Sequence, residues 1–376
     1  MTRVRYILHL CATAFLLFTG LQNTCGQTIR HILPNFKVIN RPVADTIRIC
    51  IMGDMMMHEA QIVTAATKDG SYEFSSYFQF IENDIRNADI AIANMEYTLA
   101  GEPYCGYPCF SAPESYATYL ADCGFDVFLA ANNHIFDKGH NGAEKTLEVY
   151  RKLQQSHNIV FTGLAGTETE RSGNHPLTLN CKGAEIALIN FTYGTNLGSG
   201  AHWPKVNYMS DKSCIEEALK AANKSDFTLV LPHWGEEYSL KHSENQRTTA
   251  EWLYKKGADA IVGSHPHVVQ DYETINGCPV VYSLGNAVSN MSAANTQIGL
   301  MTTLTLVRQH NGKTRLLEPE FRYLWCSRPG GYSHSYTVIP VKEFIGTKDK
   351  WQGSWEYEKM ISTYERVKQS TGIKEK

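Results

Sequence analysis

The stretch TIRICIMGD, residues 46–54, is a short apolar run that ends in a glycine and an aspartate. A run of this length and β-branched composition predicts a strand. Seven further runs of the same kind follow along the chain, at residues 89–94, 126–131, 158–163, 185–191, 227–233, 259–264 and 279–286. We therefore expect a β-sheet framework that begins at Thr46.

Segments with helical periodicity separate these runs, at residues 75–87, 114–124, 142–156, 214–225 and 243–257. Gly124 and Gly257 end two of them, and glycine adopts the left-handed conformation of a helix C-terminus at little cost. Alternation of strands and helices predicts a layered α/β domain.

After Gln297 the pattern changes to two apolar runs, residues 298–308 and 314–324. Asn311 and Gly312 lie between them, so the two runs predict strands around a turn. Residues 355–376 predict one amphipathic terminal helix. The expected division is a main domain at residues 46–325 and a C-terminal extension at residues 326–376.

The N-terminus carries Arg3 and Arg5, an apolar middle, and small residues near Cys25 and Gly26. This is the composition of a secretory signal peptide, at residues 1–26, followed by a polar arm or linker at residues 27–45. The apolar run is shorter than the ~20 residues of a membrane-spanning helix, so a retained signal anchor is the less favoured alternative. We expect export to a periplasm or cell envelope, with no transmembrane segment in the mature chain.

Eight cysteines lie outside the expected signal peptide. In an oxidising compartment, the pair in YCGYPC, Cys105 and Cys109, predicts either a loop disulfide or two packed thiols. Several of the others lie in apolar runs and are expected to be buried free thiols.

Charged residues form 19% of the chain and the formal net charge is −3. Lysine and arginine are scattered, which gives no indication of nucleic-acid binding.

Five of the predicted strands end in groups that bind metals or transfer protons. In an open α/β sheet, ligand sites form outside the carboxyl ends of the strands, so these groups converge if the strands are neighbours. In chain order the groups are Asp54, Asn94 with Glu96, Asn132 with Asn133 and His134, His233 with Glu236, and His265 with His267.

Each group also has a structural alternative. Asp54 alone could cap a turn or helix, and the NNH run could bond to its own backbone. His233 could pack beside Trp234, while His265 and His267 could belong to a rigid turn around a proline. Five such coincidences together favour one shared site.

The residue types favour a divalent metal over a nucleophilic triad, because the sequence has no G-x-S-x-G motif and no cysteine motif beside these histidines. Imidazole, carboxylate and amide ligands suit zinc, manganese or iron. His134 follows Asn133, an expected ligand, and histidine is the side chain most often used for proton transfer, which makes His134 the preferred proton donor.

Six ordered motifs, over residues 47–290, resemble the CapA-type capsule-synthesis (poly-γ-glutamate synthesis) family: GDMMMHE, IANMEYTL, AANNHIFDKG, LPHWGEEY, GADAIVGSHPHVVQ and VVYSLGN. That family is related to the calcineurin-like metallophosphoesterases. The resemblance implies a four-layer α/β/β/α sandwich with two mixed β-sheets flanked by helices. It also implies that the metal ligands are Asp54, Glu96, Asn133, His233, His265 and His267.

The motifs depart from a metallophosphoesterase at two places. Met56 stands where a histidine is expected, and NME replaces the bridging aspartate motif. We therefore expect one bound metal rather than two. His58 could compensate only if the chain turns, because in a continuing strand it would lie roughly 13 Å beyond Asp54.

The resemblance implies an exported protein that acts in synthesis, export or release of an anionic surface polymer such as poly-γ-glutamate, as a metal-dependent hydrolase or transferase of an ester or amide bond. The polymer or its synthesis machinery would be the partner. Two alternatives remain, a metal-dependent phosphoesterase and a non-catalytic polymer-binding or assembly subunit. Supporting residues, which orient ligands or touch substrate, are expected to be Asn94, Asn132, Glu236, Gln270 and Asn286, with Gln246 as a weaker candidate.

Overall fold

The computed structural model describes residues 37–39, 46–198, 200–309 and 314–375. The expected signal peptide, most of the expected arm, and the turn at Asn311 and Gly312 lie outside these residues. Within the described part of the chain, no helix is both long enough and apolar enough to cross a membrane.

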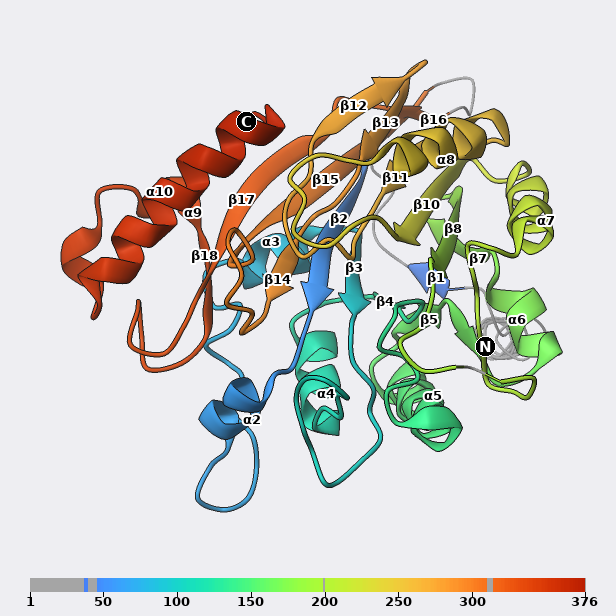
Figure 1. The fold of residues 1–376 in the computed structure, drawn as a ribbon. Coiled ribbons are helices and arrows are strands. Elements are labelled where there is room, and N and C mark those ends of the chain that lie inside the picture. The colour runs from blue at the N-terminus through green and yellow to red at the C-terminus, as the bar shows by residue number, and fades with distance from the viewer. Residues whose placement is uncertain (1–36, 40–45, 199, 310–313, 376) are drawn as a thin grey trace, which may run out of the picture. The chain divides into compact units, whose positions relative to one another are not determined.

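Two large mixed sheets carry the fold (Figure 1). The seven-stranded sheet has the order β1-β7-β8-β10-β11-β13-β12, and its strands are β1 (Lys37–Ile39), β7 (Leu177–Cys181), β8 (Ala184–Thr192), β10 (Phe227–His233), β11 (Ala260–Val262), β13 (Cys278–Val281) and β12 (Tyr272–Ile275). The nine-stranded sheet has the order β18-β17-β15-β2-β3-β4-β5, with β14 on β2 and β16 on β15. Its strands are β18 (Thr337–Pro340), β17 (Glu320–Ser327), β15 (Ile298–Arg308), β2 (Thr46–Met55), β3 (Ile90–Met95), β4 (Val127–Leu129), β5 (Val160–Thr162), β14 (Asn286–Val288) and β16 (Thr314–Leu316).

The remaining elements are a small two-stranded sheet and the helices. The small sheet pairs β6 (Leu164–Ala165) with β9 (Lys205–Val206). The helices are α2 (Glu59–Ala65), α3 (Glu82–Asn87), α4 (Glu114–Asp122), α5 (Gly139–Ser156), α6 (Glu168–Asn174), α7 (Lys212–Ala222), α8 (Glu244–Lys255), α9 (Val341–Phe344), the 3-10 turn η1 (Lys348–Lys350) and α10 (Ser354–Thr371).

Alternation along the strands sorts the apolar side chains into layers. Ile49 and Ile51 of β2 face Leu188 of β8 in a core between the two sheets, while Met52 faces the opposite side of its sheet. The outer face of the nine-stranded sheet packs against α2 to α5, and the outer face of the seven-stranded sheet packs against α7 and α8. This is the expected four-layer α/β/β/α arrangement.

The C-terminal residues belong to the same compact unit, Lys37–Lys376, as the main domain. β17 runs through the expected boundary at residue 325, and Met360 and Val367 of α10 pack into the core between the sheets. Glu356, fully buried on α10, accepts hydrogen bonds from the side chain of Gln297 and the backbone of Arg328. Hydrophobic burial and the Glu356 hydrogen bonds together hold α10 in place.

Two further expectations differ from the structure. The segment 75–87 is helical only over α3, because the Tyr77 carbonyl accepts a hydrogen bond from the backbone of Val338 in β18 and the Tyr77 and Phe78 rings fill the core. The expected arm contributes β1, which pairs with β7.

The expected strand 279–286 is two strands in different sheets. β13 belongs to the seven-stranded sheet, and the chain crosses at Gly285, whose φ is +65°, to form β14 beside β2. The crossing places Asn286 opposite Asp54 in the strand register.

The crossing depends on Gly53, because a Cβ there would lie 1.9 Å from the Gly285 carbonyl oxygen. We expect Gly53→Ala to lower the free energy of unfolding by about 1–3 kcal/mol, since backbone must shift to relieve the overlap. Gly198→Ala is the control, because its Cβ would meet nothing within 4 Å. Denaturant unfolding of the two variants measures the difference, and equal stabilities would contradict the assigned role of Gly53.

Candidate metal centre

Two carboxylates lie side by side at the carboxyl ends of parallel strands β2 and β3. Asp54 is the residue before the last one of β2, and Glu96 directly follows β3. Both are fully buried, and Asp54 Oδ2 and both carboxylate oxygens of Glu96 have no hydrogen-bond partner in the described structure. Burying a carboxylate without hydrogen bonds is costly, so a bound cation would stabilise this pair.

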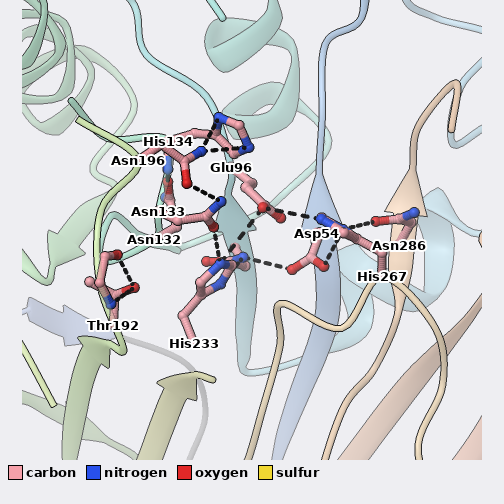
Figure 2. A network of polar contacts seen from close by, with 12 residues as sticks. Asp54, Glu96, Asn132, Asn133, His134, Thr192, Asn196, His233, His267 and Asn286 are labelled. Carbon is pink, nitrogen blue, oxygen red and sulfur yellow. Dashed lines mark hydrogen bonds and ion pairs between the residues drawn. The ribbon is translucent and has the colours of Figure 1, made fainter. Parts of the chain in front are cut away.

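The other sheet brings three histidines to the same place. His233 ends β10, and His265 and His267 follow the parallel neighbour β11. His233 Nε2 and His267 Nε2 each lie 3.6 Å from Glu96 Oε1, and His267 Nδ1 lies 3.3 Å from Asp54 Oδ2 (Figure 2). The expected convergence of strand ends therefore occurs, but between two facing sheets rather than along one.

Three overlapping groups of side chains have ligand atoms within 4.8 Å of one another. They are Glu96 with His233 and His265, Asp54 with Glu96 and His267, and Glu237 with His265 and His267. Imidazole and carboxylate donors at this spacing fit a divalent transition metal, and the orphaned Glu96 oxygens belong to two of the groups.

The electrostatics of the cluster also favour a cation. Burial, and then the charge of Asp54, raise the pKa of Glu96 well above its usual range. Burial lowers the pKa of His265 to about 3 and that of His233 well below its usual value, with nearby histidines adding to both effects. Burial also acts to lower the pKa of His267, but the Asp54 carboxylate, 3.3 Å from its Nδ1, outweighs this effect and raises the pKa.

Asn286 fixes the orientation of His267. Its amide nitrogen donates to Ser289 Oγ and the Thr296 carbonyl oxygen, which leaves Oδ1 as the acceptor for His267 Nδ1 at 3.0 Å. A protonated Nδ1 leaves His267 Nε2 free to bind a metal.

Asn94 and Asn133 join the two sheets within the cluster. Asn94 Nδ2 lies 2.7 Å from Asp54 Oδ1 and 3.2 Å from His233 Nδ1. Asn133 Oδ1 lies 2.6 Å from His233 Nε2, so this predicted ligand points toward the histidine–carboxylate cluster (Figure 2).

His134, the predicted proton donor, faces an aspartate that sequence reasoning missed. His134 Nδ1 lies 2.7 Å from Asp137 Oδ2, which also accepts the backbone N–H of Phe110. Asn132 supports this loop, because its side chain accepts the His134 N–H and donates to the Met95 carbonyl oxygen. The spacing of three residues in NNHIFD was the available signal for Asp137.

Asn196 is a further site residue that the sequence did not predict, because no strand end or motif in the sequence pointed to it. Its side chain lies 3.3 Å from His134 Nδ1 and 3.4 Å from Asn133 Nδ2. It follows no predicted strand, and only the folding of the loop after β8 brings it to the cluster (Figure 2).

The loop after β10 carries two neighbouring glutamates that differ in their relation to the donor groups. Glu236 is exposed and belongs to none of the three donor groups, whereas its neighbour Glu237 belongs to one. Gln270 lies behind this loop, where it bonds to the carbonyl oxygens of Ser239 and Lys241. Gln246 is buried rather than solvated and donates to Gln270. Both glutamines hold the loop rather than reach the donors.

His58 does not replace the missing histidine ligand. The chain turns after β2, and His58 caps the start of α2, but it is in none of the donor groups found among the described residues. Its Nδ1 instead accepts the backbone N–H of Asn290 at 3.2 Å. Met56 is buried beside the site.

The cysteine pair is not bonded in this structure. Cys105 and Cys109 are free thiols, and Cys105 Sγ lies 3.1 Å from the Cys109 carbonyl oxygen. Four others are buried free thiols, as expected: Cys50, Cys123, Cys278 and Cys326. Cys181 is buried as well.

The fold and the cluster define an α/β/β/α sandwich protein with a buried histidine–carboxylate site between its two sheets. Residues 48–291 match the family model described as bacterial capsule synthesis protein PGA_cap. The chain belongs to this family, which confirms the resemblance seen in its motifs.

Two Bacillus proteins are similar to the chain in sequence. It is 28% identical to the PGA biosynthesis protein CapA of Bacillus subtilis over 305 residues, which cover 80% of this chain and 75% of that protein. It is 28% identical to the capsule biosynthesis protein CapA of Bacillus anthracis over 267 residues, 67% of this chain and 62% of that protein.

Solved structures of nucleotidases are also similar. A chain assigned as a 5'-nucleotidase from Staphylococcus aureus has a TM-score of 0.49 and 15% identity, over 78% of this chain and 54% of that chain. The NAD nucleotidase of Haemophilus influenzae has a TM-score of 0.46 and 13% identity, over 85% of this chain and 62% of that chain.

The donor groups predict that single histidines are essential for metal retention. We expect His233→Ala and His265→Ala each to lose bound metal without unfolding, because each removes a ligand from a group of three. Elemental analysis beside thermal unfolding tests this, with His157→Ala, outside every donor group, as the control. Full metal content in both site variants would contradict the assignment.

The pKa shifts predict which groups release protons when a metal binds. His233 and His265 are unprotonated in the metal-free protein at neutral pH, because their pKa values are lowered, and they release none. Glu96 and His267 have raised pKa values, so metal affinity should rise as pH rises through those values.

A pH indicator in weakly buffered protein, with saturating zinc, would count the protons released. We expect Glu96→Gln to release about one proton fewer than the wild type, because the carboxyl proton is absent. An unchanged count would show that Glu96 is already ionised without metal.

Proposed function

We propose that this protein is a metal-dependent hydrolase or transferase that acts on an ester or amide bond during production of a capsule polymer. The observation that carries the proposal is the fully buried Glu96, whose two unpartnered carboxylate oxygens face histidines from the opposite sheet. A site kept only as a structural remnant would gain stability by replacing these buried carboxyl and imidazole groups with apolar residues.

The ligands we assign are Asp54, Glu96, Asn133, His233, His265 and His267, around one zinc, manganese or iron ion. Such an ion lowers the pKa of a bound water and polarises a carbonyl group. The proposal of one ion follows from Met56, which offers no imidazole at the position where a second ion would require one.

His134 is the group we assign to proton transfer. Asp137 holds its Nδ1, so Nε2 is the atom that would give a proton to the leaving group or take one from a nucleophile. The Phe110 ring lies edge-on to His134 at 4.7 Å and restricts its rotation. A histidine oriented by a buried carboxylate is the arrangement that general acid–base catalysis requires.

The polymer we propose is poly-γ-glutamate or a related anionic chain. Support comes from membership of the capsule synthesis family and from the similarity to a PGA biosynthesis protein. Its γ-glutamyl amide bonds are of the kind that a metal-bound water can attack. We further propose that the protein acts at the cell envelope beside the synthesis machinery, as the signal-like residues 1–26 indicate.

The first experiment is metal content of the purified protein, followed by turnover of γ-glutamyl anilides, γ-glutamate oligomers and phosphate monoesters. About one equivalent of metal with cleavage of γ-glutamyl substrates supports the proposal. Cleavage of phosphate esters alone would make the protein a phosphoesterase. No metal after reconstitution with zinc, manganese and iron would leave a binding or assembly subunit.

Proton transfer by His134 predicts a selective loss of turnover. We expect His134→Gln to lower kcat by roughly 10²–10⁴-fold while metal content stays unchanged, because proton transfer by a positioned side chain contributes a factor of that size. Asp137→Asn should lower kcat less and shift the pH–rate profile. Loss of metal in His134→Gln would instead assign His134 a ligand role.

A further inference from the structure

His265 differs from the other histidines of the site in how its ring is held. Nδ1 of His267 contacts Asn286, Nδ1 of His233 contacts Asn94, and Nδ1 of His134 contacts Asp137. His265 Nδ1 is buried and has no hydrogen-bond partner among the described residues. Metal-binding histidines usually rely on a hydrogen bond at the second ring nitrogen to fix ring orientation. With Nε2 as the metal-binding atom, the described residues give His265 no such contact, so another interaction would orient its ring.

Ring packing supplies that interaction. The Tyr193 ring lies 4.4 Å from the His265 ring, centroid to centroid, and the His233 ring lies 4.9 Å away on a second contact. The His265 backbone has φ +101°, a conformation that L-residues rarely adopt and that costs on the order of 1–3 kcal/mol. Contacts with the surrounding structure must therefore hold this residue in place.

The backbone of Tyr193 is held in place without a bound metal. It directly follows β8, and its backbone N–H donates to the His233 carbonyl oxygen at 2.8 Å, which ties it to the adjacent strand β10. Its side chain is 41% exposed, whereas His265 is 2% exposed. The Tyr193 ring therefore covers His265 from the solvent side, and its removal leaves no enclosed cavity.

We propose that Tyr193 is a positioning residue that orients the His265 ring for metal binding by packing, in place of the usual hydrogen bond to Nδ1. The inference rests on the proposed metal site and deepens it. The ring face of Tyr193, rather than its hydroxyl group, would orient His265, because the two rings are in contact with their planes inclined by 38°.

The chain offers a matched control in Tyr238. Its side chain is 43% exposed at the same site, and its ring lies 6.4 Å from that of His267. His267 already has its Nδ1 fixed by Asn286, so loss of the Tyr238 ring should leave His267 in place.

The first measurement is zinc affinity by competition with a chromophoric chelator, for Tyr193→Ala, Tyr193→Phe and Tyr238→Ala. We expect Tyr193→Ala to bind zinc 10–100-fold more weakly, the range found when a contact that orients a ligand is lost. Tyr193→Phe and Tyr238→Ala should bind within threefold of the wild type. Thermal unfolding of each metal-free variant controls for loss of structure.

The second measurement is the histidine ring spectrum of the metal-free protein by NMR, with the His265 signal assigned from His265→Gln. We expect Tyr193→Ala to broaden or shift the His265 ring signals and to leave those of His267 unchanged. This readout needs no metal, so it tests the packing even if the wild type binds none and the proposed function fails.

Two results would overturn the proposal. Zinc affinity of Tyr193→Ala within threefold of the wild type would show that the ring does not position His265. An equal loss in Tyr193→Phe would assign the effect to the hydroxyl group instead.

Discussion

The structure around the site depends on the placement of two carboxylates, Asp54 and Glu96, next to each other in the interior. Both side chains are fully buried, and the ion-pair partners described for them are the imidazoles of His233 and His267. Such a pair is tolerated if one carboxyl takes a proton or if a cation binds between them. The raised pKa of Glu96 is the first response, and the neutral imidazoles opposite make the second possible.

Two facing sheets make this arrangement. The carboxylates come from β2 and β3 of one sheet, and His233, His265 and His267 come from β10 and β11 of the other. The chain crosses between the sheets at Gly285, where Gly53 allows the backbones to meet. Fold and site therefore share one constraint, since a shift of β14 would move Asp54 and the Asn286 contact to His267 together.

Much of the site could be predicted because strand ends are visible in a sequence. Asp54, Glu96 and the three histidines each follow an apolar run, and parallel strands bring such positions to one edge. Glu237 and Tyr193 could not be predicted, because they lie in loops whose path depends on contacts distant in sequence. The backbone N–H of Tyr238, next to Glu237, donates to the Pro266 carbonyl oxygen, and the backbone N–H of Tyr193 donates to the His233 carbonyl oxygen.

The sequence by itself determined the strands that carry the site residues, most of the helices, and the residue types that gather where strands end, because these depend on local periodicity. The strands β7, β12 and β18 were not among those expected. It did not determine that 279–286 splits between two sheets, or that 75–81 forgoes a helix for a hydrogen bond with β18. Nor did it determine that His265 is held by a ring rather than a hydrogen bond. Those features arise from contacts between segments that are distant in sequence, which local periodicity does not specify.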